Sequence, residues 1–594
     1  MHFSRLLVVV PALLVGVYAI PFTSYQQFES LPSVPKGWEV VSERAVDPSM
    51  PIKLRIHLVK QNVEAFRRAV IELSTPGHPS YGNHMSQRSI DAMLRPREEN
   101  FAAVKNWLAS QGLADKITLN NDWIQVSTTI GEAESLLHTK YQVFQDTKSG
   151  DKVVRALSYS IPRELHSSIN FVQPTTMFGR VSAMRSTIVR VEDASTLRID
   201  SEGPDAEDPD AAGCNTSITP KCLADLYKYA DYDVDAAGIA SNASWTNQIG
   251  INGFLEQYAQ NDDLSKFLKK YALTPKTSNS TFTCQPINNG LCTQHPQEDF
   301  TEANLDIQYT VSGTGSIPNI YFSTAGRPPA QDLDPNTNEP YLDWVKEILE
   351  LDENKLPQTI TTSYGDDEHT VPRSYAIEVC DKFAELGARG VTLLFSSGDS
   401  GPGSDCQTKD GKKQFVPTFP ATCPFVTSVG GTVGVNPERA VGFSSGGFSN
   451  YFPRPDYQDA LVGDYLAKQS DPKNYAQYFN ATGRGFPDVS AQGQSFHVFV
   501  RGFDTLVSGT SASSPALAAI ISLWNQERRK TGKKPLGFLN PLIYSTARSG
   551  FVDITAGSSR GCSETISGAG WKATTGWDPV TGLGTPDFSA LKSL

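Results

Sequence analysis

A serine within a run of small residues is the strongest candidate nucleophile in this chain. Ser511 lies in the sequence Ser-Gly-Thr-Ser-Ala-Ser-Ser-Pro, and an apolar stretch of helix length follows, ending at Trp524. The pattern predicts that the Ser511 hydroxyl lies at the start of a buried helix, where free backbone N–H groups can hold an oxyanion. Pro515 agrees with this placement, because a proline four residues on denies the Ser511 carbonyl its helical partner. The alternative interpretation of Gly-Thr-Ser alone is a polar loop that caps a core helix.

A serine nucleophile needs a base, and a pair of carboxylates is the best candidate. The histidines after residue 213 are His295, His369 and His497, and none lies in a Gly-rich His-Gly-Thr sequence. Glu302 and Asp306 are spaced i and i+4, so a helix places both on one face, about 5–6 Å apart at Cβ. Proximity and partial burial raise the pKa of one carboxyl, so the pair can share a proton and act first as base and then as acid. The alternative interpretation is a solvated helix face.

A third carboxylate follows a buried strand. The sequence from Leu393 to Gly401 reads as an apolar strand ending in a glycine-rich turn, which is a good place to expose the polar side chain of Asp399. The same turn contains Gly-Asp-Ser-Gly-Pro, which resembles the Gly-Asp-Ser-Gly-Gly-Pro of chymotrypsin-like peptidases and would make Ser400 the nucleophile. We do not favour Ser400, because no Ala-Ala-His-Cys segment occurs and the domain does not read as all-β.

Together these segments resemble the sedolisin family of serine peptidases, whose nucleophile segment is similar to that of the subtilisins. The resemblance implies a Ser-Glu-Asp triad in which Glu302 takes the proton of Ser511 and Asp306 holds Glu302. It also implies that Asp399 is protonated at working pH and donates to the oxyanion together with the Ser511 amide. A charged carboxylate at Asp399 would repel that intermediate, so we expect an acidic pH optimum.

Two glycine-rich loops near the C-terminus carry further carboxylates. Oxygen ligands without nearby imidazole or thiolate suit Ca²⁺, although from composition alone the loops could be ordinary turns. The pattern resembles the sedolisin calcium site, which implies one structural calcium ion as cofactor. The implied ligands are the carboxylates of Asp553 and Asp578 and the backbone carbonyls of Ile554, Thr574 and Gly576.

The N-terminal part of the chain reads as an export signal followed by a separate domain. Residues 1–19 combine a short basic head, an apolar run and a small residue at Ala19, which is typical of a signal peptide. Residues 20–200 contain no cysteine and alternate strand-like and helical patterns, so we expect an α+β domain. The stretch from Tyr81 to Pro96 resembles the sedolisin propeptide; an independent binding module is the alternative. An acidic linker follows, to about residue 212.

Residues 213–594 are predicted to form the peptidase domain. The start at Ile218 resembles that of sedolisin catalytic domains, and short β-type runs then alternate with helical ones. This alternation predicts an α/β fold, a subtilisin-like and mostly parallel sheet with helices on both faces. The predicted strands are Gln248–Phe254, Asn319–Phe322, Gln358–Ser363 and Gly390–Ser396.

The cysteines, the glycosylation sequons and the net charge limit where the protein works and what it binds. All eight cysteines lie beyond residue 213, so disulfides are expected, with Cys214–Cys222 and Cys284–Cys292 favoured by their close spacing. The net charge of −12 argues against a nucleic-acid surface, and no apolar run after the signal is long enough to span a bilayer. We therefore expect a secreted, extracellular protein. The predicted glycosylation sequons begin at Asn215, Asn242, Asn279 and Asn480.

The function predicted from this resemblance is a secreted, acid-active serine-carboxyl peptidase of the fungal tripeptidyl-peptidase type. It would release tripeptides from the free N-termini of polypeptides through an acyl-enzyme on Ser511, act as a monomer and have its own propeptide as intramolecular inhibitor. An acid endopeptidase of the same fold is the alternative, and a catalytically silent, calcium-stabilised binding protein is a third hypothesis. Asp366 and Asp367 are candidates to pair with the substrate α-amine. The segments Thr361–Asp366 and Ser444–Ser449 resemble the substrate-lining strands of the family, which would pair with the peptide; ordinary sheet edges are the alternative.

Overall fold

The computed structural model describes residues 24–178, 187–189 and 213–594, with gaps at 36, 42–45, 148–149, 151, 236–239, 241–244, 298, 326–340 and 409–410. The predicted signal peptide, the acidic linker and the sequon at Asn242 lie outside the described residues. None of the helices in the described part of the chain is long and apolar enough to cross a membrane. The domain boundaries at residues 200 and 213 stay predictions.

The N-terminal domain is α+β, as predicted, and contains a four-stranded antiparallel sheet of order β4-β5-β3-β9. The central strand β3 buries Ile52, Leu54 and Ile56, every second residue, against the helices, which is the period expected for a sheet with one covered face. The elements are β1 (Tyr25–Ser30), β2 (Trp38–Val40), β3 (Pro51–Leu58), α1 (Val63–Ser74), α2 (Gln87–Leu94), α3 (Glu98–Ser110), β4 (Ile117–Leu119), β5 (Trp123–Thr129), α4 (Ile130–Leu137), β6 (Gln142–Asp146), β7 (Lys152–Arg155), β8 (Ser158–Pro162) and β9 (Ile169–Gln173).

The C-terminal domain is built on an eight-stranded sheet of order β12-β13-β11-β14-β16-β18-β19, with β22 also paired to β18. Every pairing is parallel except that of the edge strand β19, and the central strands are buried along their whole length. This confirms the predicted α/β fold. The strands of this sheet are β11 (Ile249–Gly253), β12 (Phe282–Ile287), β13 (Asn319–Thr324), β14 (Thr359–Thr362), β16 (Thr392–Ser396), β18 (Thr427–Val433), β19 (Arg439–Ala440) and β22 (Val489–Gln492).

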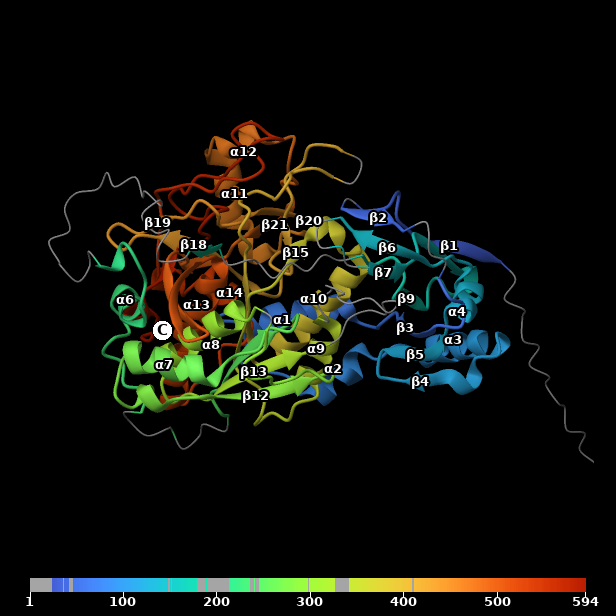
Figure 1. Cartoon of the computed structure of the whole chain (residues 1–594), viewed down its shortest axis with the longest axis horizontal. Coiled ribbons are helices and arrows are strands. Elements are labelled where there is room, and N and C mark those ends of the chain that lie inside the picture. The colour runs from blue at the N-terminus through green and yellow to red at the C-terminus, as the bar shows by residue number, and fades with distance from the viewer. Residues whose placement is uncertain are drawn as a thin grey trace, which may run out of the picture.

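Helices cover this sheet, and two of them lie closest to its centre in Figure 1, α8 in green and α13 in orange. They approach so closely that a Cβ placed on Gly313 of α8 would lie 2.8 Å from the Cβ of Ala519 on α13. The helices of this domain are α6 (Pro220–Leu226), α7 (Asn261–Tyr271), α8 (Thr301–Thr314), α9 (Tyr341–Leu349), α10 (Arg373–Ala388), α11 (Asp459–Lys468), α12 (Asp471–Asn474), α13 (Thr510–Lys530), α14 (Asn540–Ile543) and α15 (Phe588–Leu591).

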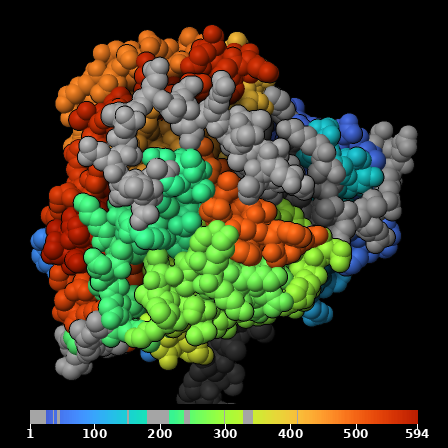
Figure 2. Space-filling model, turned by 60° about the vertical axis from the view of Figure 1, so that its left-hand side comes forward, coloured from blue at the N-terminus to red at the C-terminus, as the bar shows by residue number. Residues whose placement is uncertain are grey.

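Smaller sheets surround the central one. The hairpin of β23 and β24 lies against α7, and Figure 2 shows it in orange across the green surface of that segment. A short strand at residues 187–189 adds to its edge. The remaining strands are β10 (Thr187–Val189), β15 (Asp366–Asp367), β17 (Thr418–Phe419), β20 (Gly447–Pro453), β21 (Gly483–Phe486), β23 (Phe496–Val500), β24 (Phe503–Ser508), β25 (Phe551–Val552) and β26 (Thr585–Pro586).

The two domains share an apolar contact. Phe66 and Val70 of α1 belong to the same buried cluster as Val379 and Phe383 of α10. Figure 1 accordingly shows the blue helices α1 and α2 near α10, apart from the strands of the N-terminal domain. The N-terminal domain therefore docks on the helices that cover one face of the large sheet.

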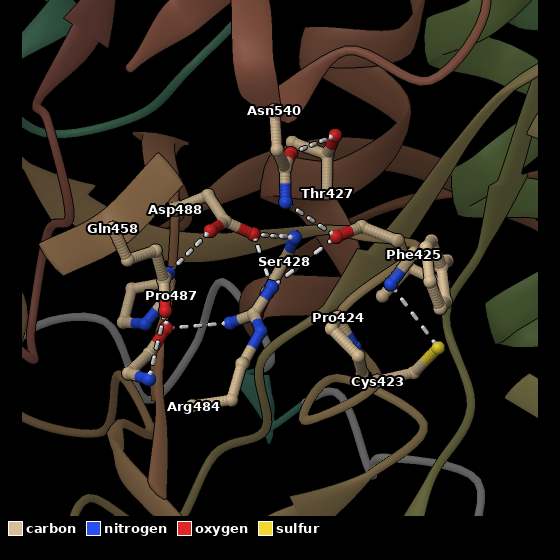
Figure 3. A network of polar contacts seen from close by, with 12 residues as sticks. Cys423, Pro424, Phe425, Thr427, Ser428, Gln458, Arg484, Pro487, Asp488 and Asn540 are labelled. Carbon is tan, nitrogen blue, oxygen red and sulfur yellow. Dashed lines mark hydrogen bonds and ion pairs between the residues drawn. The ribbon is translucent and has the colours of Figure 1, made fainter. Parts of the chain in front are cut away.

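Four disulfides and one buried ion pair hold the loops of the C-terminal domain. The two disulfides favoured by spacing are present, and the others join Cys380 to Cys423 and Cys406 to Cys562. In Figure 3 the side chain of Arg484 points at the carboxylate of Asp488; both are fully buried. Asp488 also accepts the Ser428 N–H at 2.7 Å, so this pair ties the start of β22 to β18 and acts as scaffold.

Candidate active site

Ser511 lies in the first turn of α13, as the sequence predicts. It is fully buried, and the helix begins at the preceding residue, Thr510. Because Pro515 has no N–H, the Ser511 carbonyl lacks its helical partner; the hydroxyl of Ser363, at the end of β14, lies 3.4 Å from that oxygen. The strand end and the helix start therefore meet at the nucleophile.

The two carboxylates of α8 are buried, which excludes the solvated-face interpretation. Glu302 is 5% exposed and Asp306 is 1% exposed. The helix is fixed against β23, because Asn304 and Gln308 donate to the Phe499 carbonyl at 2.9 and 2.8 Å. Asn304 and Gln308 thus hold the side of α8 that lies opposite the two carboxylates.

Asp306 is joined to the nucleophile segment by one side chain. The Ser363 hydroxyl donates to Asp306 Oδ1 at 2.9 Å and lies against the Ser511 carbonyl. Burial and then the neighbouring Glu302 carboxylate raise the pKa of Asp306 well above its usual value, and the Ser363 hydrogen bond only partly opposes this. Within the described residues no cation forms an ion pair with Asp306, so a proton is its available charge partner.

Two buried tyrosines, Tyr321 and Tyr364, lie within reach of the charges of this pair, and sequence reasoning missed them. The Tyr321 hydroxyl donates to the Gln257 carbonyl at 2.6 Å, and burial followed by the charges of Asp306 and Glu302 raises the pKa of Tyr321. Gly253 makes room for this ring, since a Cβ there would lie 1.9 Å from the Tyr321 oxygen. A glycine at the last position of a buried strand was the one signal that could have indicated the close approach.

Asp399 lies after β16 and is bound to the residue before the nucleophile. Its Oδ1 accepts the backbone N–H of Thr510 at 2.7 Å and the Thr510 hydroxyl at 2.9 Å. Its Oδ2 is buried and has no hydrogen-bond partner among the residues that the structure describes. Burial raises the pKa of Asp399 to about 6 against both hydrogen bonds. The carboxyl group is therefore protonated in acid and then carries a donor beside Ser511.

Ser400, in the same turn, is exposed, and its backbone N–H donates to the Ser445 hydroxyl at 2.9 Å. No described side chain forms a hydrogen bond with the Ser400 hydroxyl, so no base activates it here. The geometry favours Ser511.

The predicted cleft-lining segments meet at a residue that sequence reasoning missed. Glu368 is fully buried; its carboxylate accepts the Ser449 hydroxyl and, at 2.7 Å, the Asn450 N–H. It thereby links the segment after β14 to β20. Of the candidates for amine recognition, Asp366 is 9% exposed and Asp367 accepts the Ser404 hydroxyl at 3.0 Å.

The two C-terminal loops bring the predicted calcium ligands together. Asp553 accepts the Gly576 N–H at 2.8 Å and Asp578 accepts the Thr574 N–H at 2.9 Å, so both carboxylates bind one short loop. The Thr574 hydroxyl is buried without a hydrogen-bond partner among the described residues. Neither carboxylate forms an ion pair within that part of the chain. Two carboxylates without an ion-pair partner, beside a free hydroxyl oxygen and without imidazole or thiolate, fit a hard cation such as Ca²⁺; Ile554, which follows Asp553, is buried.

Two family models match separate parts of the chain. Residues 37–178 match the family described as "Pro-kumamolisin, activation domain", and residues 333–566 match the "Subtilase family". The chain is 44% identical over 592 residues to the tripeptidyl-peptidase SED2 of Arthroderma otae, covering 96% of each chain. It is 41% identical over 605 residues to the probable tripeptidyl-peptidase SED3 of Arthroderma benhamiae, covering 99% of this chain and 98% of that one.

Among solved structures, a Pseudomonas sedolisin, a serine-carboxyl proteinase, aligns with a TM-score of 0.47 at 21% identity, over 64% of this chain and 97% of that one. The full-length likeness to the fungal enzymes is what decides the family. The chain therefore belongs to the sedolisin family, together with these fungal peptidases.

Proposed function

We propose that this chain is a secreted, acid-active serine-carboxyl peptidase that releases tripeptides from free N-termini of polypeptides. The observation that carries the proposal is the contact of Ser363 with both Asp306 and the Ser511 carbonyl, which puts a buried carboxylate pair beside a helix-start serine. The tripeptidyl-peptidase names of the fungal relatives support the substrate class. The proposal of secretion rests on the predicted signal peptide. The proposal that the enzyme acts as a monomer rests on the predicted fold alone.

In this mechanism Glu302 accepts the Ser511 proton as the hydroxyl oxygen attacks the scissile carbonyl. Asp306 holds the shared proton and orients Glu302, because burial and the Glu302 carboxylate raise the pKa of Asp306. The same carboxyl pair then returns a proton to the leaving amine. In the second half-reaction the pair takes a proton from water as the water attacks the acyl-enzyme, and returns it to the Ser511 oxygen as the product leaves. Both half-reactions need the pair to hold one proton, which acid supplies.

Asp399 supplies the second part of the chemistry. When protonated, its carboxyl can donate to the oxyanion that forms on the substrate, next to the Ser511 N–H at the start of α13. Because its pKa is raised to about 6, this donor is present below that pH and is lost above it. Two independent features of the site thus require acid.

Calcium is proposed as a structural cofactor at Asp553, Ile554, Thr574, Gly576 and Asp578. The bound ion would supply charge compensation to the two carboxylates and fix the loops that end the domain. Asp578 is the central residue, since its Oδ1 also accepts the N–H groups of Val580 and Thr581 at 3.0 and 2.9 Å. Removing calcium with a chelator is expected to lower the thermal midpoint of unfolding.

The nucleophile assignment is tested by a matched pair of serine variants. Ser511→Ala is expected to lower kcat by on the order of 10⁵-fold or more, because no other group forms the acyl-enzyme. Ser400→Ala, in the neighbouring turn, is expected to stay within about twofold of the parent. The opposite ranking would assign the reaction to Ser400.

The substrate class is tested with a tripeptide fluorophore and its N-acetylated form. A tripeptidyl-peptidase is expected to cleave only the free amine form, because a carboxylate near the third subsite would pair with it. Asp366→Asn and Asp367→Asn then indicate which carboxylate provides this contact through a raised KM. Equal cleavage of both substrates would favour the acid endopeptidase.

A further inference from the structure

A segment of the N-terminal domain places a histidine in a socket of the C-terminal domain. The docking segment, Tyr81–Met85, lies between α1 and α2, and the Met85 N–H donates to the Ala388 carbonyl at the end of α10 at 2.8 Å. His84 lies beside it, with Nε2 3.0 Å from the Pro535 carbonyl oxygen. The segment thus makes two polar contacts with the other domain through adjacent residues.

The socket is shaped for an imidazole ring. It consists of Gly390, Pro535 and Gly537, and a Cβ on Gly390 would lie 3.0 Å from His84 Cδ2. A Cβ on Gly537 would lie 2.7 Å from His84 Cε1. Both glycines also have positive φ, 91° and 66°, which side chains rarely adopt. The ring of His84 therefore fits only because Gly390 and Gly537 have no side chain.

The hydrogen bonding of the His84 ring determines which ring nitrogen carries the hydrogen. A carbonyl oxygen only accepts, so His84 Nε2 must carry the hydrogen that it donates to Pro535. Nδ1 is buried and has no hydrogen-bond partner among the described residues. In the neutral ring Nδ1 carries no hydrogen, whereas a protonated ring would bury an unpaired N–H and a positive charge.

The charged groups around the socket also disfavour a protonated ring. Arg528 of α13 and Lys534 of the following loop face His84, and Arg389, the residue after α10, donates instead to the Leu349 and Leu351 carbonyls. Within the described residues no carboxylate forms an ion pair with His84. Burial, together with the charges of Arg528 and Lys534, lowers the pKa of His84, against the hydrogen bond to Pro535.

We infer that the His84 socket is an interaction surface that accepts the propeptide through a neutral imidazole and rejects the imidazolium, so that acid undocks this segment. The inference rests on the proposal that the N-terminal domain is a releasable propeptide. A group whose pKa is lower when docked stabilises docking fully above its free value of about 6.5. As the pH falls from there toward the docked pKa, the stabilisation is lost, and the equilibrium constant for docking falls by about tenfold per pH unit.

The test uses the full-length Ser511→Ala chain, which cannot process itself, and hydrogen–deuterium exchange of the docking segment and of residues 385–391. After correction for intrinsic exchange, protection of the parent is expected to fall about tenfold or more between about pH 7 and pH 5. His84→Gln, which stays neutral and can still donate to Pro535, is expected to retain protection over this range. His84→Lys, which is charged throughout, is expected to lose protection already at neutral pH.

His78→Gln is the matched control, because His78 lies in the same loop and, among the described residues, its side chain accepts a hydrogen bond only from the Ser80 N–H, at 3.2 Å. It is expected to follow the parent. An unchanged pH dependence in His84→Gln, undocking of that variant at neutral pH, or full protection in His84→Lys would overturn the inference. Since the chain tested has no nucleophile, these outcomes do not depend on the proposed peptidase activity, which the serine variants test separately.

Discussion

Two sets of buried carboxylates in this chain have surroundings that give them opposite properties. On α8, Glu302 and Asp306 lie together, and the pKa of Asp306 is raised. At the contact between the two domains, Asp122 lies 2.8 Å from Lys382 and 3.7 Å from Lys60, and the charges of these lysines hold its pKa well below the usual value despite burial. The residue type and the degree of burial are nearly the same.

The difference lies in what compensates the negative charge. Lys60 of the N-terminal domain also lies 2.6 Å from Glu378 on α10, and Lys382 lies 3.0 Å from Glu385, so two cations serve three carboxylates. At the α8 pair a shared proton takes that place in the proposed mechanism. Two carboxyl groups that share one proton leave one of them free to act as a base, whereas a carboxylate paired with lysine is fixed as an anion and serves as a contact between domains.

The largest expected effect separates the two sets directly. Glu302→Gln removes the proposed base and is expected to lower kcat of the processed enzyme by roughly 10³- to 10⁴-fold. Glu378→Gln, an equally isosteric change of a buried glutamate, is expected to leave turnover of the processed enzyme within about twofold. Comparable losses in both variants would remove the distinction between a reactive and a structural carboxylate.

The second prediction concerns the oxyanion donor. Asp399→Asn keeps a donor at every pH, so we expect a loss of about 10- to 100-fold in acid, where the carboxyl is the better donor. The decline of kcat/KM as the pH rises through about 6 is expected to weaken in the variant, because an amide does not titrate in that range. A profile that keeps the parent's alkaline limb would assign that limb to another group.

The third prediction concerns the lysine-paired set. Because the pKa of Asp122 is lowered, its contribution to stability is present above its ordinary pKa of about 3.8 and is lost as the pH falls below it. In the Ser511→Ala chain, Asp122→Asn is expected to destabilise the unprocessed form by about 3 kcal/mol at neutral pH and to reduce the further loss in acid. Urea unfolding at two pH values measures both effects.

Glu64→Gln provides the control for this experiment, because the Glu64–Arg67 pair, 2.6 Å apart, is solvent-exposed at Glu64. It is expected to change the free energy of unfolding by less than about 0.5 kcal/mol. Equal effects of Asp122→Asn and Glu64→Gln would contradict the buried network.

The smallest effect is expected at Ser363. Ser363→Ala removes the donor to Asp306 Oδ1, whose hydrogen bond lowers the pKa of Asp306. We expect kcat to fall by about 3- to 10-fold, and the limb of the pH profile that reports loss of the shared proton from Asp306 to move to higher pH. A loss in kcat without any movement of the profile would indicate a role in packing instead of charge balance.

The sequence predicted the elements that carry the chemistry, because each has a local pattern. Small residues before an apolar run placed Ser511 at a helix start, and the i, i+4 spacing placed Glu302 and Asp306 on one face. The alternation of short β-type and helical runs predicted the parallel sheet. Burial of the α8 pair was not visible in the sequence, since the same spacing occurs on solvated helices.

Contacts between distant segments could not be predicted. Ser363 and Asp306 are 57 residues apart, and nothing near either residue indicates the other. The lysine-paired set joins Lys60 and Asp122 to Lys382. Lysine and aspartate are usually exposed to solvent, so a sequence alone gives no reason to expect them buried together. His84 likewise fits only because Gly390 and Gly537 leave room for it in the other domain.

The dependence of kcat/KM on pH, measured on the processed enzyme with a free tripeptide fluorophore, tests the central claim most directly. If a carboxylate pair and a protonated Asp399 carry the reaction, the rate has its maximum in acid and declines as the pH rises through about 6. A rate that keeps rising above neutrality would mean that an imidazole, not Glu302, activates the serine.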